Sequence, residues 1–238
     1  MNKIEYFITE LDFIDDPKIK EIAQNLIGQL PDYFFEVAAS STGKAVPQDE
    51  TSTVPSLRQS KRKYHPEYAL GKEGLIRHTK AAVRIANDLL RLEMFKGLSE
   101  KKDLIITALL LHDGWKHGRE PKAYLASSST EAAAALSKYN NYAQSNHPLI
   151  AAEMVEELCE DKEIATQLAT LIKTHMGQWN TDWKTGVEIM PKPETQRRAS
   201  KSKFVISIFV ALLRKIQSFV HLCDYLASRK FLEFNFEV

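Results

Sequence analysis

The sequence has little cysteine, almost no excess charge of either sign and no long apolar run. Its 2 cysteines, Cys159 and Cys223, lie in no metal-binding or redox spacing, which excludes a disulfide framework and is typical of a reducing cytosol. The formal net charge is +1, so no overall basic field attracts nucleic acid or an anionic membrane. The longest apolar run, residues 204–213, is about half of the roughly 20 residues that a membrane-spanning helix needs. The N-terminus has no basic segment followed by an apolar one. We therefore expect a cytoplasmic protein with no membrane partner.

Strand patterns are also scarce. Only a weak alternation over residues 231–238 favours a strand, whereas most of the chain repeats apolar residues every three or four positions. Ser99 is expected to cap one of the resulting helices, since it stands just before residue 100. The predicted fold class is all-α, with helices over residues 17–30, 74–92, 100–112, 148–160, 163–176 and 206–230, the last as one long helix or two short ones.

Two polar stretches interrupt the helical pattern. Residues 43–63 contain two prolines among many polar side chains, and residues 185–202 contain two more prolines followed by a basic cluster. Neither stretch separates two segments that could each form a core. A single domain over residues 1–238 is therefore expected, and the chain is long enough for a sizeable core.

The most informative local feature is the string LLLHDGWKHG, residues 109–118. An apolar helix runs directly into adjacent His112 and Asp113, and burying an imidazole and a carboxylate together requires compensation. A divalent metal ion would supply it, because imidazole nitrogen and carboxylate oxygen are natural ligands for such ions. For this pair alone, a histidine packed at a helix end beside a capping aspartate is an equally good interpretation.

Other residues of the same two types share this inward placement. His78, His175 and Asp224 fall in register with apolar positions of their helices, and His147 precedes Pro148 at a predicted helix start. Each histidine taken singly is more often a hydrogen-bonded core residue than a metal ligand. A buried aspartate without a basic partner at helical spacing, such as Asp224, is rare. Four inward histidines and two inward carboxylates together indicate a shared positive charge at the centre.

The order of these six residues resembles the HD-domain superfamily of metal-dependent phosphohydrolases. It is most similar to the six-ligand variant that holds two metals, as in HD-GYP phosphodiesterases and some HD oxygenases. The string HDGWKHG also resembles the HD-x-x-K-x-G pattern, with Lys116 in the lysine position. Residues 64–79 and 219–236 are similar to a bacterial and phage group of stand-alone HD proteins. The resemblance implies one HD-type helical domain with a core at about 64–236 and an N-terminal helical extension at 1–40.

The sequence also departs from this pattern. The GYP motif is absent, so specificity for a cyclic dinucleotide is not implied. In the stand-alone proteins a Ser-Thr-Gly-Lys string is expected to run almost directly into Tyr-His-Pro, whereas here the two strings end at Lys44 and begin at Tyr64. Residues 45–63 therefore resemble an insertion, and the basic and apolar residues 197–215 resemble a second one. Either insertion could alter access to the site or contribute to a homo-oligomer.

The resemblance implies two divalent transition-metal ions. One would be held by His78, His112, Asp113 and Asp224, and the second by His147 and His175 with Asp113 bridging. Ligation by nitrogen and oxygen alone does not choose among manganese, iron, cobalt, nickel and zinc. Such a pair of ions would activate a bridging water and polarise a phosphoryl oxygen.

Lys116 is the second expected catalytic residue beside Asp113, because it could offset charge on a phosphate oxygen. Without the resemblance, a solvated lysine at a helix end is about as good an interpretation. Weaker candidates for substrate contact are Lys44, His65 and Trp179, the last by stacking on a base, although packing or exposure explains Trp179 better. His221 precedes Asp224 by three residues and could support a ligand through a hydrogen bond.

The predicted function is a metal-dependent phosphohydrolase, a phosphodiesterase or nucleotidase that acts on a small-molecule or short oligonucleotide phosphoester. A di-iron oxygenase is an alternative, because the same six ligands serve oxygen chemistry within the superfamily. A non-catalytic protein that binds nucleotides or nucleic acid through the basic residues 58–63 and 197–203 is another. Extended nucleic acid is not favoured as a partner, because such charge runs in loops are usually only solvated.

Overall fold

The computed structural model describes residues 2–37, 39, 66–69, 72–119, 146–177 and 204–228. These residues are helical and include no strand, which confirms the predicted all-α class. None of the helices in these ranges is both long and apolar enough to cross a lipid bilayer. The predicted insertion at 45–63 and the weak strand pattern at 231–238 lie outside the described residues.

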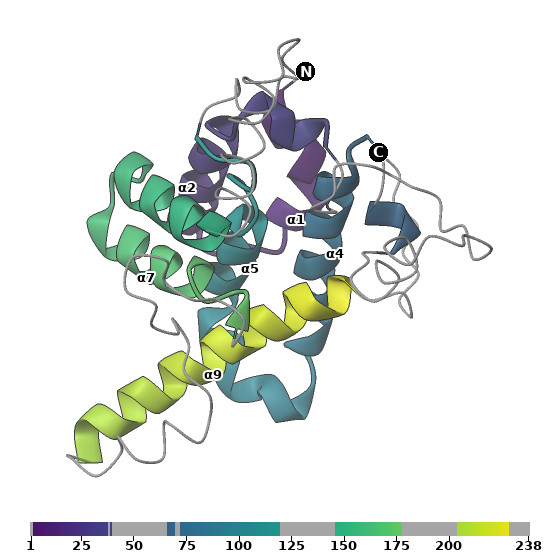
Figure 1. Cartoon of the computed structure of the whole chain (residues 1–238). Coiled ribbons are helices and arrows are strands. Elements are labelled where there is room, and N and C mark those ends of the chain that lie inside the picture. The colour runs from purple at the N-terminus through teal and green to yellow at the C-terminus, as the bar shows by residue number, and fades with distance from the viewer. Residues whose placement is uncertain are drawn as a thin grey trace, which may run out of the picture.

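The elements are α-helices and 3₁₀-helices, the latter written η; Figure 1 labels the α-helices. Residues 146–158 form one further helical segment. The remaining elements in chain order are η1 (Lys3–Phe7), α1 (Ile8–Leu11), α2 (Pro17–Gly28), η2 (Asp32–Phe35), η3 (Glu67–Ala69), α4 (Gly74–Leu89), η4 (Glu93–Lys101), α5 (Lys102–Leu111), α7 (Lys162–Ile172) and α9 (Phe204–Ala227).

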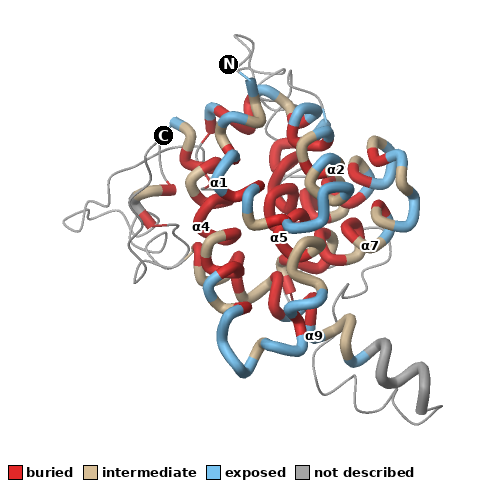
Figure 2. The backbone as a smooth tube through the Cα atoms, turned by 180° about the vertical axis from the view of Figure 1, so that it is seen from behind, coloured by how far each residue is buried: buried red, intermediate tan, exposed pale blue. Residues whose placement is uncertain are grey.

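Helix α5 lies at the centre of the molecule. Every residue from Ile105 to Leu111 is buried, and α5 packs against α2, α4, α7 and α9. Figure 2 shows the buried residues gathered along α4 and α5, with exposed residues on the outer elements. A helix that is apolar on all sides is stable only when other helices surround it. The chain that leaves the C-terminal end of α5 therefore emerges inside the protein.

Aspartate caps fix the starts of the two helices that flank α5. Asp16 accepts hydrogen bonds from the backbone N–H groups of Lys18 and Ile19 at the start of α2, and Asp161 does the same for Glu163 and Ile164 at the start of α7. Each cap satisfies N–H groups that have no partner within the helix.

A third aspartate ties α5 to α2. Asp103, in the first turn of α5, accepts hydrogen bonds from the backbone N–H groups of Asp15 and Asp16 at 3.2 and 2.7 Å. The central helix is thereby fixed in position against the capped start of its neighbour.

The N-terminal residues belong to the same core as the rest of the chain. Phe7, Leu11, Leu26 and Phe34 are buried in the hydrophobic cluster that also contains residues of α4 and α5. The segments η1, α1, α2 and η2 therefore pack as a layer on the helices that carry the rest of this cluster. The apolar face of this layer would otherwise be exposed to water.

One local prediction differs from the structure. Ser99 does not cap α5, because η4 continues directly into α5 and the Ser99 hydroxyl instead donates to the carbonyl of Leu90 at 3.4 Å. The helix predicted at 206–230 is confirmed as one continuous helix, α9, which begins at Phe204, so residues 204–215 of the second predicted insertion lie in a helix. The uncharged apolar run at 204–213 favours helix over loop once it joins the periodic pattern that follows it.

The packing beside Gly114 generates a stability prediction. A Cβ atom at Gly114 would lie 2.5 Å from Leu30 Cδ2 and 3.1 Å from the Leu111 carbonyl oxygen, whereas a Cβ at Gly28 would meet nothing within 4 Å. We expect Gly114→Ala to lower the free energy of unfolding by about 1–3 kcal/mol through overpacking. Gly28→Ala, the matched control, should leave stability unchanged or raise it by about 0.4–1 kcal/mol.

Urea denaturation followed by circular dichroism measures both variants. The double variant Gly114→Ala with Leu30→Val should lose less stability than the sum of the single changes, because the smaller side chain makes room for the new methyl group. Equal stability of Gly114→Ala and the wild type would contradict this account of the packing.

Candidate metal centre

The six residues predicted from the sequence to hold metal lie together in the core. His78 comes from α4, His112 and Asp113 from the turn that follows α5, and Asp224 from α9. His147 lies in the helical segment 146–158, and His175 in the turn after α7. None of the six exposes more than 9 % of its surface. They form two groups of three, each able to hold a metal ion: His78, His112 and Asp224 in the first, and Asp113, His147 and His175 in the second.

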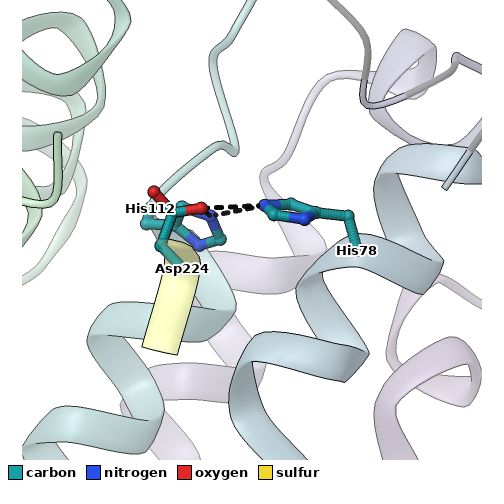
Figure 3. A group of neighbouring side chains, drawn as sticks. All are labelled: His78, His112 and Asp224. Carbon is teal, nitrogen blue, oxygen red and sulfur yellow. Dashed lines mark hydrogen bonds and ion pairs between the residues drawn. The ribbon is translucent and has the colours of Figure 1, made fainter. Parts of the chain in front are cut away.

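The first group brings three helical segments to one point (Figure 3). Nε2 of His78 lies 3.3 Å from Nε2 of His112 and 3.1 Å from Oδ1 of Asp224. Nε2 of His112 lies 3.6 Å from the same Asp224 oxygen. Asp224 thus has histidine partners from two other helical segments, which the spacing within its own helix could not reveal.

The second group has nearly the same spacing. Nε2 of His147 lies 3.0 Å from both Nε2 of His175 and Oδ1 of Asp113, and Nε2 of His175 lies 3.7 Å from that oxygen. Oδ1 of Asp113 is fully buried and has no hydrogen-bond partner among the described residues. A buried carboxylate oxygen in that state carries a substantial desolvation cost.

Asp113 contacts both groups. While Oδ1 belongs to the second group, Oδ2 lies 3.7 Å from Nε2 of His78 and from Nε2 of His112. One carboxylate therefore has an oxygen facing each group. This is the placement that a bridging ligand requires, and the bridging role itself stays a prediction.

Backbone carbonyl groups orient two of the imidazole rings. Nδ1 of His112 lies 2.6 Å from the carbonyl oxygen of Leu109, and Nδ1 of His175 lies 2.7 Å from that of Ile172. Because a carbonyl oxygen only accepts hydrogen bonds, each Nδ1 must carry the proton, and in the neutral ring Nε2 carries a lone pair. Both lone pairs then point into the groups. A ligating histidine typically donates its other ring N–H in this way.

The spacing within each group fits a shared ion. Two ligand atoms that are each about 2.1 Å from a metal lie about 3.0–3.4 Å apart, at octahedral or tetrahedral angles. The observed separations are 3.3, 3.1 and 3.6 Å in the first group and 3.0, 3.0 and 3.7 Å in the second. Nitrogen lone pairs that face one another or a carboxylate at these distances repel. A cation between them turns that repulsion into coordination.

The protonation states of the groups also suit metal ligation. Burial by itself would raise the pKa values of Asp113 and Asp224. The charges of Lys116 and His112 hold the pKa of Asp113 well below its usual range, and the contacts of Asp224 with His112 and His78 do the same for the pKa of Asp224. Burial, together with His112 and His147, lowers the pKa of His175 to about 3. At neutral pH both carboxyl groups are therefore ionised and His175 is neutral, as metal ligands must be.

His112 behaves differently from His175. Burial acts to lower its pKa, but the adjacent Asp113 and Asp224 carboxylates raise it overall. The two negative charges thus favour the protonated, positively charged form of the His112 ring. They would stabilise a bound cation beside the ring in the same way.

Lys116 contacts the centre directly. Its Nζ atom lies 2.5 Å from Oδ2 of Asp113, and the side chain is largely buried. The sequence predicted a contact with substrate phosphate, which nothing in the structure tests. The structure places the ammonium group on the oxygen of Asp113 that faces the first group.

The remaining candidates divide into two kinds. Lys44, His65 and Trp179 lie outside the described residues. His117 is buried with its ring edge-on to Tyr33, and burial and the Lys116 charge lower its pKa to about 4, but it belongs to neither group. His221, predicted to support a ligand, donates from Nδ1 to the carbonyl oxygen of His175 at 2.6 Å.

The carbonyl groups that orient the rings were not predicted from the sequence. Leu109 precedes His112 by three residues, and Ile172 precedes His175 by three. This spacing of three residues can be read from the sequence. A side chain just past a helix end can reach the carbonyl group three residues before it.

The geometry predicts that divalent transition-metal ions stabilise the folded protein. Manganese or cobalt at 100 times its dissociation constant should raise the free energy of unfolding by about 2.7 kcal/mol, since the unfolded chain has no assembled site. EDTA should reverse the gain. Thermal and urea denaturation with and without the ion measure this difference.

Variants localise the stabilisation. Asp113→Asn should abolish the metal-induced gain, whereas His117→Gln, the replacement of a buried histidine outside both groups, should retain it. Equal gains in Asp113→Asn and the wild type would mean that the ions bind elsewhere.

Comparison with known proteins adds no relative. No protein-family model, no curated protein and no solved structure matches the chain. The arrangement of the six buried residues is therefore the basis for assigning a function.

Proposed function

We propose that this protein is an HD-type phosphohydrolase that uses two divalent transition-metal ions to hydrolyse a phosphoester of a nucleotide or short oligonucleotide. The observation that carries the proposal is the pair of buried His/Asp groups that share Asp113. The order of the six residues along the chain, with the HD-x-x-K pattern at 112–116, supports the assignment to this superfamily.

Each residue has a distinct task in this proposal. His78, His112 and Asp224 would hold one ion, His147 and His175 would hold the other, and Asp113 has an oxygen facing each group. Two such ions would supply a nucleophilic water at neutral pH and polarise a phosphoryl oxygen. The buried apolar side chains of α5 lower the polarity around these residues, which strengthens the charge interactions among them.

In this proposal, the ammonium group of Lys116 interacts with the phosphate group of the substrate. Its ammonium group is paired with Asp113 Oδ2, and metal ligation of that carboxylate would weaken the pairing. The freed ammonium group can then donate to a phosphate oxygen on which negative charge develops. The buried position of Lys116 makes such a contact stronger than it would be in water.

The charge balance of the chain favours a small substrate. With a formal net charge of +1, the protein has no overall field to attract a long polyanion. Affinity for a phosphoester would come from the ions and Lys116, which recognise a single phosphate group. We therefore propose a nucleotide or a short oligonucleotide in preference to extended nucleic acid.

Hydrolysis of bis(p-nitrophenyl) phosphate by manganese- or cobalt-loaded protein tests the proposal. Asp113→Ala should lower kcat/KM by at least about 100-fold, because losing the shared ligand removes several kcal/mol of transition-state stabilisation. Lys116→Gln should lower kcat by about 10²–10³-fold, as removal of one charge-stabilising donor does elsewhere. His117→Gln serves as the control and should keep most of the activity.

The alternative functions give different outcomes. An iron-loaded protein that consumes oxygen and shows a mixed-valence signal, without releasing p-nitrophenol, would identify a di-iron oxygenase. Salt-sensitive oligonucleotide binding with no hydrolysis by any metal-loaded form would identify a non-catalytic binding protein. Hydrolysis that survives Asp113→Ala would show that the assigned residues do not carry the reaction.

A further inference from the structure

His221 connects the helix that carries one metal ligand to the turn that carries another. It lies on α9, three residues before Asp224, so the two side chains share a face of that helix. Asp224 reaches the first group, with Oδ1 3.1 Å from His78 Nε2. His221 instead reaches the turn that contains His175, a member of the second group.

The contact with this turn has a polar and an apolar part. Nδ1 of His221 donates a hydrogen bond to the carbonyl oxygen of His175 at 2.6 Å. Its ring also packs against Gly177, since a Cβ atom built there would lie 2.8–2.9 Å from three ring atoms. Gly177 has φ +61°, a conformation that favours glycine, and the missing side chain leaves room for the imidazole. The turn is thus shaped to accept the ring.

The turn has limited support of its own. His175 lies three residues beyond the end of α7, and its backbone N–H makes a hydrogen bond of 3.2 Å to the carbonyl of Ile172. The N–H of Gly177 donates to the carbonyl of Thr174 at 2.8 Å. These bonds are internal to the turn and its adjoining helix end. The bond from His221 ties the carbonyl group of the ligand residue itself to a different helix.

We infer that His221 is a positioning residue that holds His175 in place for the second metal ion, so that α9 supports both ions. This inference rests on the proposed two-metal function. Through Asp224, α9 supplies a ligand to the first group, and through His221 it fixes the backbone of a ligand in the second. Loss of His221 therefore affects the two groups unequally.

The same helix offers a matched control. Gln217 lies one turn before His221 and donates from its side-chain amide to the carbonyl oxygen of Thr170 on α7 at 3.4 Å. Both residues thus link α9 to a backbone carbonyl of the α7 region, but Thr170 lies five residues before His175. A general loosening of α9 from α7 would follow either substitution, whereas a loss of ligand positioning would follow only the change at His221.

Cobalt binding measured by titration calorimetry and visible absorption tests the inference. Wild type should bind two ions. His221→Ala should bind the first ion with unchanged affinity and the second about 10–100-fold more weakly, as expected when the partner that orients a ligand is lost. His221→Asn, whose side-chain N–H can replace the Nδ1–H donor, should recover most of that affinity. Gln217→Ala should bind both ions as the wild type does.

A substitution at Gly177 tests the same contact, because the ring of His221 packs against this residue. Gly177→Ala places a methyl group where the ring lies, so it should displace His221 and weaken the second ion as His221→Ala does. Hydrogen exchange in the metal-free protein gives a readout without metal: exchange across residues 173–177 should rise in His221→Ala and stay unchanged in Gln217→Ala.

The outcomes separate the two proposals. A wild type that binds fewer than two ions contradicts the two-metal function and the inference with it. A wild type that binds two ions, with His221→Ala matching both affinities, overturns the inference alone. Equal losses for the two ions in His221→Ala, or equal losses in His221→Ala and Gln217→Ala, would also overturn it, because either result indicates a general structural role.

Discussion

The structure depends on an unfavourable burial of charge. Helix α5 is apolar on every side and must lie at the centre, so the two residues that follow it, His112 and Asp113, emerge where water is excluded. A carboxylate there is costly unless positive charge surrounds it. The protein surrounds it with Lys116 and with histidines from other segments, all within about 4 Å of Asp113. Each of the two His/Asp groups around it could also hold a metal ion, which would add further positive charge.

The centre joins the layers of the fold. Besides the turn after α5, its side chains come from α4, the helical segment 146–158, the turn after α7, and α9. An ion in the first group would stabilise the packing of α4, the turn after α5 and α9, and an ion in the second would join that same turn to the segment 146–158 and the turn after α7. The contact of His221 with the His175 turn extends this connection, because it joins the two groups through α9 as well as through Asp113. The side chains proposed to bind metal are thus also the side chains that connect these helices and turns.

Much of the candidate site could be predicted from the sequence. Helical periodicity placed His78, His175 and Asp224 on inward faces, and the apolar run before residue 112 placed the adjacent pair at a buried helix end. The same periodicity predicted a helix at 206–230, which is present as the one continuous helix α9. Residue type alone misled at Ser99: it suits a helix cap, but a continuous 3₁₀-to-α transition removes the helix start that it would cap.

The sequence by itself determined the fold class, the inward placement of the ligand residues and the type of chemistry that imidazole and carboxylate groups allow. Only the tertiary structure decided which residues form each group, that Asp113 has one oxygen facing each, and that Lys116 pairs with that carboxylate. It also decided that His221 forms a hydrogen bond with the carbonyl oxygen of His175, which is 46 positions away in the chain. The physical reason is that periodicity reports the direction of a side chain relative to its own helix. Distances between atoms on different helices depend on how those helices pack.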